Sequence, residues 1–359
     1  MSAIKNRPAR GLTLVELMVA MVIGLVVVLV ATRLFVGSRA TQRATDETAA
    51  LFETGQMVLE LLGREIANAG FYPVVSTEPT VGSGVPSTNV LVSYDAAVKG
   101  LNGGVVPDAY LYGLYGCADG KLNATLSGCV ANGTGDPSGS DTLVVSYFTN
   151  DAFSLDVGQR GDCSRADVGA DTLYNAGRVG EVTKTSASGP VKEARGTMGL
   201  PPTSPLLVAN RFFLNALSYV DDQGKRINTF ALACRGNGGG STVDLVPGVV
   251  QMTVRYGVFS DDTLRPQTYL TATEVRALSA LTLGDGAVYQ PWQRVASVRL
   301  CVMVRSLSST RFQDGGTGGA NVVDCNGTSV TPPSGVVYRT FTQVFGVKNR
   351  QLRTVELPL

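Results

Sequence analysis

The longest apolar run of the chain lies close to its N-terminus. Between residues 12 and 32 the sequence carries one ionisable side chain, Glu16, among mostly Val, Leu, Met, Ile and Ala residues. At the α-helical rise this run is about 30 Å long, enough to cross the hydrocarbon core of a bilayer. Three basic residues and no acidic residue precede it. The pattern therefore predicts a membrane-spanning helix over residues 12–36, with a cytoplasmic N-terminus and an exported remainder.

Helical periodicity continues beyond the apolar run. Residues 37–69 contain no proline, and apolar residues recur at helical spacing from Leu51 to Ile66, with charged residues on the other faces. We expect one helix from Leu12 to about Ala69, roughly 85 Å long at the α-helical rise. Its amphipathic second half is expected to pack against a sheet.

Glycines mark the weak points and the end of this helix. Gly24, Gly55 and Gly63 lie inside it, and each costs ~1 kcal/mol relative to alanine. Gly70, which Pro73 follows, is suited to the left-handed residue that closes many helices. We therefore predict that the helix ends just before Gly70.

The middle of the chain is rich in loop-forming residues. Pro, Gly, Ser and Asn are frequent over residues 74–141, and residues 151–205 match neither a long helix nor a clear strand. We interpret the first segment as loops with edge strands and the second as a candidate insertion. Between them, the β-branched and aromatic segment Asp141–Phe148 predicts a strand.

Strand patterns dominate the C-terminal third. Strands are predicted over Phe212–Val220, Ile227–Cys234, 250–258, 298–305 and 336–347, and a short helix over Thr271–Leu283. Asp, Gln and Gly residues between the first two strands predict a hairpin turn. Apolar and polar residues alternate in 250–258 and 298–305, which is typical of antiparallel strands with one buried face. The fold class is therefore α+β, a long helix packed on an antiparallel β-sheet head that spans residues 70–359 and has long loops.

A short motif precedes the apolar helix. The sequence Gly11-Leu12-Thr13-Leu14-Val15-Glu16 places a small residue, then apolar residues, then an acid inside the membrane segment. A carboxylate near the membrane centre costs ~2.5–3.5 kcal/mol, so such an acid is usually kept for a partner. An ordinary signal peptide or signal anchor is the alternative, but no small-x-small cleavage site closes the apolar run.

This motif resembles the class III signal of type IV prepilins. The resemblance implies that prepilin peptidase removes residues 1–11 after Gly11 and that the new N-terminal amine of Leu12 is methylated. It also implies that Glu16 pairs with the amine of a neighbouring subunit during assembly and that residues 12–36 form the filament core. Leu12 stands where the family usually has phenylalanine.

Three C-terminal blocks extend the resemblance to the PilW family of minor pilins. The blocks are LVPGVVQMTVRYGVF (245–259), WQRVASVRLCVMVRS (292–306) and YRTFTQVFGVKNRQ (338–351). The chain departs from the family at Val347-Lys348, where Leu-Arg is usual. The resemblance implies a minor pilin of the type IV pilus, or fimbrium, that helps to initiate pilus assembly or lies at the pilus tip, with roles in twitching motility and cell adhesion.

The same resemblance implies partners and a location. The expected partners are other minor pilins, the major pilin, prepilin peptidase, the inner-membrane assembly machinery and a larger tip adhesin. The expected location is the bacterial inner membrane with a periplasmic head, and later the pilus. A type II secretion pseudopilin is the alternative within the class, although its head is usually much smaller. A membrane-anchored periplasmic binding domain or enzyme is the alternative outside the class.

Composition narrows the chemistry further. The chain has 359 residues and no histidine, which excludes histidine-based triads and imidazole metal ligands. Removal of the proposed leader leaves 27 basic and 29 acidic side chains, so no global basic field favours nucleic-acid binding. No catalytic constellation is visible. We expect no enzymatic activity, no cofactor and no metal.

Six cysteines follow the membrane segment. They are Cys117, Cys129, Cys163, Cys234, Cys301 and Cys325. An even number in an exported domain predicts disulfides, for which fifteen complete pairings exist. We favour Cys117–Cys129 across a short loop and Cys301–Cys325 between a strand and the loop after it, which leaves Cys163–Cys234. A zinc site is disfavoured because the chain has no C-x-x-C pair.

Two weaker signals have ordinary explanations. Asn123, Asn132 and Asn326 each begin an N-glycosylation pattern, but modification is not expected in a bacterial prepilin. Asp/Gly clusters at 131–141, 221–224 and 314–324 lack the EF-hand spacing, so we interpret them as turns rather than calcium sites.

Overall fold

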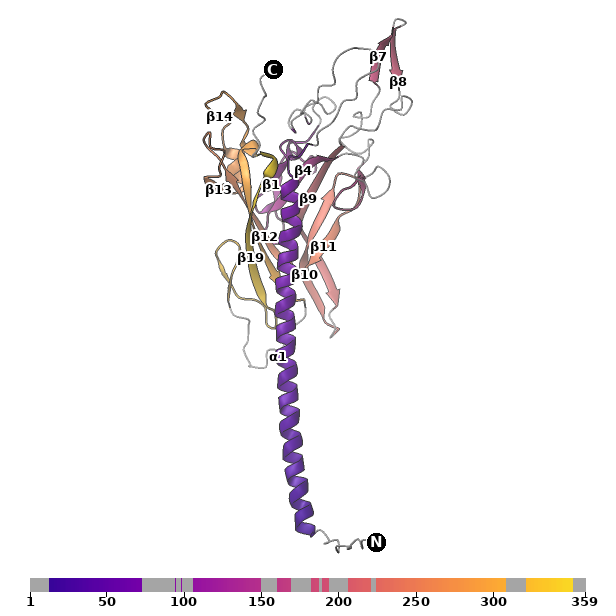
Figure 1. The fold of residues 1–359 in the computed structure, drawn as a ribbon, viewed down its shortest axis with the longest axis vertical. Coiled ribbons are helices and arrows are strands. Elements are labelled where there is room, and N and C mark those ends of the chain that lie inside the picture. The colour runs from indigo at the N-terminus through magenta and orange to yellow at the C-terminus, as the bar shows by residue number, and fades with distance from the viewer. Residues whose placement is uncertain are drawn as a thin grey trace, which may run out of the picture.

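The computed structural model describes residues 13–72, 94, 98, 106–149, 160–168, 182–186, 189–193, 206–220, 224–307 and 321–350. Within them it has one long N-terminal helix and a β-rich head (Figure 1). The proposed leader, Leu12 and Pro73 lie outside the described residues, as do the Asp/Gly clusters at 221–223 and 314–320 and most of the candidate insertion at 151–205.

Helix α1 runs without interruption from Leu14 to Asn68. Its 55 residues correspond to about 80 Å at the α-helical rise. Gly70 follows the C-cap Ala69 with φ +68°, the left-handed conformation that glycine adopts without strain. The predictions of a single helix and of its end before Gly70 are therefore confirmed.

The head contains two antiparallel sheets. The five-stranded sheet has the order β1 (Leu114–Cys117), β4 (Thr142–Thr149), β9 (Leu206–Val220), β10 (Arg226–Gly236) and β11 (Val243–Pro247). The four-stranded sheet has the order β13 (Thr268–Leu270), β12 (Val249–Val258), β16 (Val295–Arg305) and β19 (Tyr338–Gly346). Each predicted strand overlaps one of these, and the predicted hairpin is β9–β10.

Small elements decorate the sheets. The two-stranded pairs are β2 (Gly120–Leu122) with β3 (Cys129–Ala131), β5 (Arg160–Gly161) with β6 (Asp167–Val168), β7 (Val182–Ser186) with β8 (Gly189–Glu193), β14 (Leu281–Thr282) with β15 (Val288–Tyr289), and β17 (Val322–Val323) with β18 (Ser329–Val330). The short helices are α3 (Ala272–Ala277), η2 (Asp108–Tyr110), η5 (Pro291–Arg294) and η6 (Lys348–Arg350). The helix predicted over Thr271–Leu283 is shorter than expected, because it leaves helical geometry at Leu278 and β14 follows.

The second half of α1 lies against both sheets (Figure 1). Its apolar stripe is buried, and the members are Leu51, Val58, Leu59, Leu62 and Ile66. On the side of the five-stranded sheet, Asn210 Nδ2 of β9 donates to Glu65 Oε2 of α1 at 2.8 Å. The expected packing of an amphipathic helix on a sheet is confirmed, and the helix joins the two sheets through one core.

Two glycines of α1 receive aromatic rings from β19. A Cβ atom at Gly55 would overlap the ring of Phe341, and one at Gly63 would overlap the ring of Phe345. Phe341 and Phe345 lie four residues apart on one face of the strand, and the two glycines lie eight residues apart on the helix. The two spacings match, because a strand rises about twice as far per residue as an α-helix. The sequence marked these glycines as weak points of the helix. In the fold they allow β19 to approach α1 closely.

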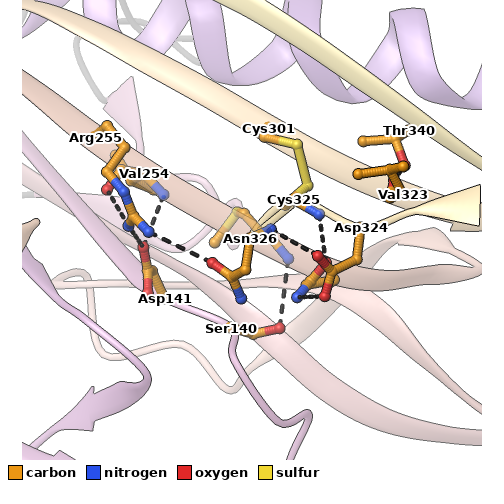
Figure 2. The surroundings of a disulfide bond; sticks show 12 residues. Ser140, Asp141, Val254, Arg255, Cys301, Val323, Asp324, Cys325, Asn326 and Thr340 are labelled. Atoms are coloured by element: carbon orange, nitrogen blue, oxygen red, sulfur yellow. Dashed lines mark hydrogen bonds and ion pairs between the residues drawn. A yellow bond between two sulfur atoms is a disulfide. The ribbon is translucent and has the colours of Figure 1, made fainter. Parts of the chain in front are cut away.

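The four-stranded sheet departs from the prediction of one buried face. Gln251, Thr253 and Met303, on the face predicted to be exposed, are only 5%, 3% and 6% exposed. The hairpin β17–β18 explains part of this burial, because Cys325 is bonded to Cys301 of β16 (Figure 2). The N–H of Cys325 also donates to Gln251 Oε1 at 2.9 Å. The prediction of an exposed second face was wrong for Gln251, Thr253 and Met303, because residues 321–330 return over part of that face.

Candidate assembly site

The N-terminal end of α1 is closed by a reciprocal capping box. The backbone N–H and the hydroxyl of Thr13 both donate to Glu16 Oε2 at 3.1 Å, and the N–H of Glu16 donates to Thr13 Oγ1 at 3.2 Å. This arrangement satisfies two backbone donors at the start of the helix. It also places the acid of the prepilin-like motif in the first helical turn. Gly11 and Leu12 lie outside the described residues, so their roles remain predictions.

The first half of α1 exposes apolar side chains on every face. The span Leu14–Arg39 contains an 18-residue window with a mean hydropathy of 2.9, and no part of that window is buried by the residues that the structure describes. Leu14, Val22 and Leu34 are 76%, 64% and 70% exposed. A helix that is apolar all round requires lipid or other helices around it. The head supplies neither at this end of the molecule (Figure 1).

A C-terminal residue fixes the other end of α1. Asn349, in η6, donates from Nδ2 to the carbonyl oxygens of Ala67 at 3.3 Å and Ala69 at 3.1 Å. These carbonyls belong to the last turn and the C-cap, where backbone acceptors lack helical partners. Sequence reasoning missed this role, because it depends on a contact between residues about 280 positions apart. The cap and the glycine contacts together hold the second half of α1 against the head.

Three disulfides tie the head together. They join Cys117 to Cys129, Cys163 to Cys234 and Cys301 to Cys325, with Cα–Cα distances of 5.6, 6.2 and 5.6 Å. These are the three pairs favoured from the sequence. The first bond ties the β2–β3 hairpin to the end of β1. The second ties the β5–β6 turn to β10, and the third ties the β17–β18 turn to β16. They stabilise a head that has many loops for its size.

A buried carboxylate connects the two sheets. Asp141, directly before β4, accepts from the N–H of Val254 in β12 at 2.7 Å and from the N–H of Asp119 at 2.8 Å. The Arg255 guanidinium lies 3.5 Å from the same carboxylate (Figure 2). Burial nevertheless raises the pKa of Asp141 above its usual range. Two backbone N–H groups and one guanidinium therefore hold this carboxylate between the two sheets.

The residues suspected of modification or metal binding take part in turns. Asn132 Nδ2 donates to Asp119 Oδ1 and to the carbonyls of Pro137 and Ser140 at 3.0–3.2 Å. Asp324 Oδ1 accepts from the N–H groups of Asn326 and Thr328 at 2.9 and 2.8 Å. In the part of the chain that the structure describes, no group of three or more acidic or cysteine side chains is arranged to hold a metal.

Two family models match parts of the chain. The family described as Type IV Pilus-assembly protein W, PilW, matches residues 219–349, and the prokaryotic N-terminal methylation motif matches residues 6–32. No curated protein matches the chain. A solved type IV-like pilin from Thermus thermophilus is similar over 84% of this chain and 97% of its own, with 8% identity and a TM-score of 0.31. The two family matches support a type IV minor pilin of the PilW type with a class III signal.

Proposed function

We propose that this minor pilin takes part in starting type IV pilus assembly and then stays near the pilus tip with other minor pilins. The observation that carries the proposal is the form of α1. One continuous helix has an apolar half that no described residue covers and a second half held against the head by a buried stripe, two glycine contacts and a C-terminal cap. When the apolar half packs against neighbouring subunits, the head that is attached to the second half is positioned with it.

The apolar half suits two successive environments. Before assembly, lipid surrounds it, and after assembly, the helices of neighbouring pilins take the place of lipid. Glu16 is costly in lipid and becomes tolerable when a positive charge pairs with it. The methylated amine of Leu12 on a neighbouring subunit is that charge in our proposal. Processing by prepilin peptidase after Gly11 is therefore required before assembly.

The proposed partners follow from this sequence of states. In the inner membrane the subunit has its N-terminus in the cytoplasm and its head in the periplasm, where it meets prepilin peptidase and the assembly machinery. Three disulfides suit an oxidising compartment of this kind. In the filament its neighbours are other minor pilins and the major pilin, and a larger adhesin sits beyond them at the tip.

The size of the head favours the tip. Residues 70–359 give a head of 290 residues, and β7–β8 extends far from α1 (Figure 1). A head of this size repeated along a filament would clash with its copies or leave gaps between them. A few copies at the tip, where one side has no neighbour, avoid this conflict.

Deletion of the gene tests the proposal. Surface pili should be lost or sharply reduced, while the major pilin is still processed and accumulates in the inner membrane. Reintroduction of the wild-type gene should restore the pili. Normal pilus numbers in the deletion strain would overturn the proposal, and normal pili with a loss of protein secretion would point to a pseudopilin instead.

A further inference from the structure

Each disulfide of the head joins two cysteines that are consecutive in the chain. The bonds are Cys117–Cys129, Cys163–Cys234 and Cys301–Cys325, with sequence separations of 12, 71 and 24. No other cysteine lies between the members of any pair. Of the fifteen complete pairings of six cysteines, this is the one in which no bond crosses or encloses another.

We propose that the head acquires its disulfides in chain order during export, so that its maturation requires a thiol oxidase but no disulfide isomerase. The inference rests on the orientation in the proposed function, in which residues after α1 leave the membrane from the N-terminal side onward. When Cys129 emerges, Cys117 is the one thiol already exported. The same holds for Cys234 and Cys163, and then for Cys325 and Cys301, once the earlier pairs have closed.

The chemistry of each step is an exchange with a dithiol–disulfide oxidase. One cysteine thiolate attacks the disulfide of the oxidase and forms a mixed disulfide. The second cysteine thiolate then attacks that bond, forms the S–S bond of the head and releases the oxidase as a dithiol. The pair of cysteines loses two electrons and two protons, and the oxidase takes up both.

The first pair is brought together by local structure. Cys117 is the last residue of β1 and Cys129 the first residue of β3. The hairpin β2–β3 between them pairs Leu122 with Cys129. This hairpin lies between residues 117 and 131, so it can form before Cys163 has been exported. Its closure removes both thiols from later competition.

The second pair is held by residues that also precede the next cysteine. The N–H of Cys163 donates to Asn210 Oδ1 of β9 at 3.0 Å, and Asp162 Oδ2 accepts from the N–H of Gly238 at 2.7 Å. These contacts fix the β5–β6 turn against the β9–β10 hairpin, which carries Cys234. All of these residues are exported before Cys301, so the second bond can close while four cysteines, not six, are outside.

The position of an unpaired cysteine tests the proposed order. Cys129→Ser leaves Cys117 as a free thiol before Cys163 and Cys234 emerge, so it should pair wrongly with one of them. Cys325→Ser leaves Cys301 free only after the first two bonds have closed, so it should cause no wrong pairing. The two variants are matched, because each removes one partly buried cysteine and one short-range bond.

The experiment compares the full chain in cells with and without the periplasmic disulfide isomerase, and in cells without the thiol oxidase. Free thiols are alkylated, and the bonds are mapped by mass spectrometry of peptides from the unreduced protein. We expect native bonds in the wild-type protein and in Cys325→Ser without the isomerase, free thiols without the oxidase, and a several-fold rise of wrong pairs in Cys129→Ser when the isomerase is absent.

Two results would overturn the proposal. One is wrong pairing of the wild-type protein in cells that lack the isomerase. The other is equal wrong pairing in Cys129→Ser and Cys325→Ser, which would mean that the bonds form after export is complete. Pilus counts in the same strains report on the proposed function separately, because a protein with native bonds can still fail to support pili.

Discussion

At the scale of single residues, Gly55 and Gly63 weaken an isolated helix but strengthen its contact with a sheet. Each lies under a phenylalanine ring of β19 that leaves no space for a side chain. The cost of ~1 kcal/mol in helix propensity is offset by the close packing of Phe341 and Phe345, which belong to the helix-facing side of the four-stranded sheet. These contacts couple the head to α1.

Substitution of Gly63 by alanine should therefore destabilise the head. The new methyl group overlaps the ring of Phe345, and overpacking of this kind costs about 1–3 kcal/mol, partly offset by better helix propensity. Gly37→Ala is the matched control, since a Cβ there meets nothing within 4 Å. Unfolding can be followed by fluorescence of Trp292, the single tryptophan, which is buried. Equal midpoints for both variants would contradict the packing described here.

Burial of Asp141 predicts that its contribution to the free energy of unfolding rises as the pH falls, which is the opposite of the usual case for a carboxylate. Asp141→Asn retains one acceptor oxygen and loses the other, which should cost about 1–3 kcal/mol at pH 7. Because burial raises the pKa of Asp141 in the folded state, the wild type gains stability as the pH falls through that pKa toward ~3.9, its unfolded value. The asparagine variant has no such gain.

The difference in the free energy of unfolding between the wild type and Asp141→Asn should accordingly grow as the pH falls from 7 to 4. Denaturant unfolding of both proteins at several pH values measures it, and the other carboxylates cancel in the difference. Asp136 should show the opposite pH dependence. Lys121 lowers its pKa in the folded state, so its contribution to the free energy of unfolding is lost as the pH falls. A penalty that shrinks toward pH 4 would show that the charged form of Asp141 stabilises the fold.

At the scale of elements, the sequence was most informative about α1 and the long strands. Their periodicity extends over many residues, so α1 and the β9–β10 hairpin could be placed closely. The favoured Cys301–Cys325 bond placed the segment around Cys325 near β16, but the covering of Gln251 and Thr253 could not be predicted, because it depends on how that segment packs across the sheet. For the same reason Asn349 could not be recognised as a cap of α1.

Glu16 can be tested through the behaviour of α1 in the membrane and in the filament. Glu16→Ala should be inserted and cleaved, but its amount in sheared pili should fall at least several-fold, because the amine of its neighbour loses its partner. Glu53→Ala, on an exposed position of the same helix, is the control. Equal incorporation of wild type and Glu16→Ala would contradict the pairing role.

Cleavage before Leu12 is the second prediction about this helix. Mass spectrometry should find a mature N-terminus at Leu12, with one added methyl group. Gly11→Val should leave the full-length chain in the inner membrane, because the cleavage site requires a small residue. A mature protein that begins at another residue would exclude the class III signal.

At the scale of the whole molecule, a large head stands on a helix whose first half is covered by none of the residues that the structure describes. The disulfides, Asp141 and the cap at Asn349 make the head and the second half of α1 one structure. The apolar surface of the first half of α1 still requires lipid or neighbouring helices around it. This combination suits the proposed subunit, whose helix would pack among the helices of other pilins.

The abundance of the protein in purified pili tests this account most directly. Quantitative immunoblotting of sheared pili, calibrated with known amounts of this chain and of the major pilin, gives the ratio of the two subunits. A subunit that initiates assembly and remains at the tip should be present in every preparation at a few copies per filament, far below the major pilin. An abundance comparable to that of the major pilin, or absence from sheared pili while the head remains folded in the membrane, would contradict it.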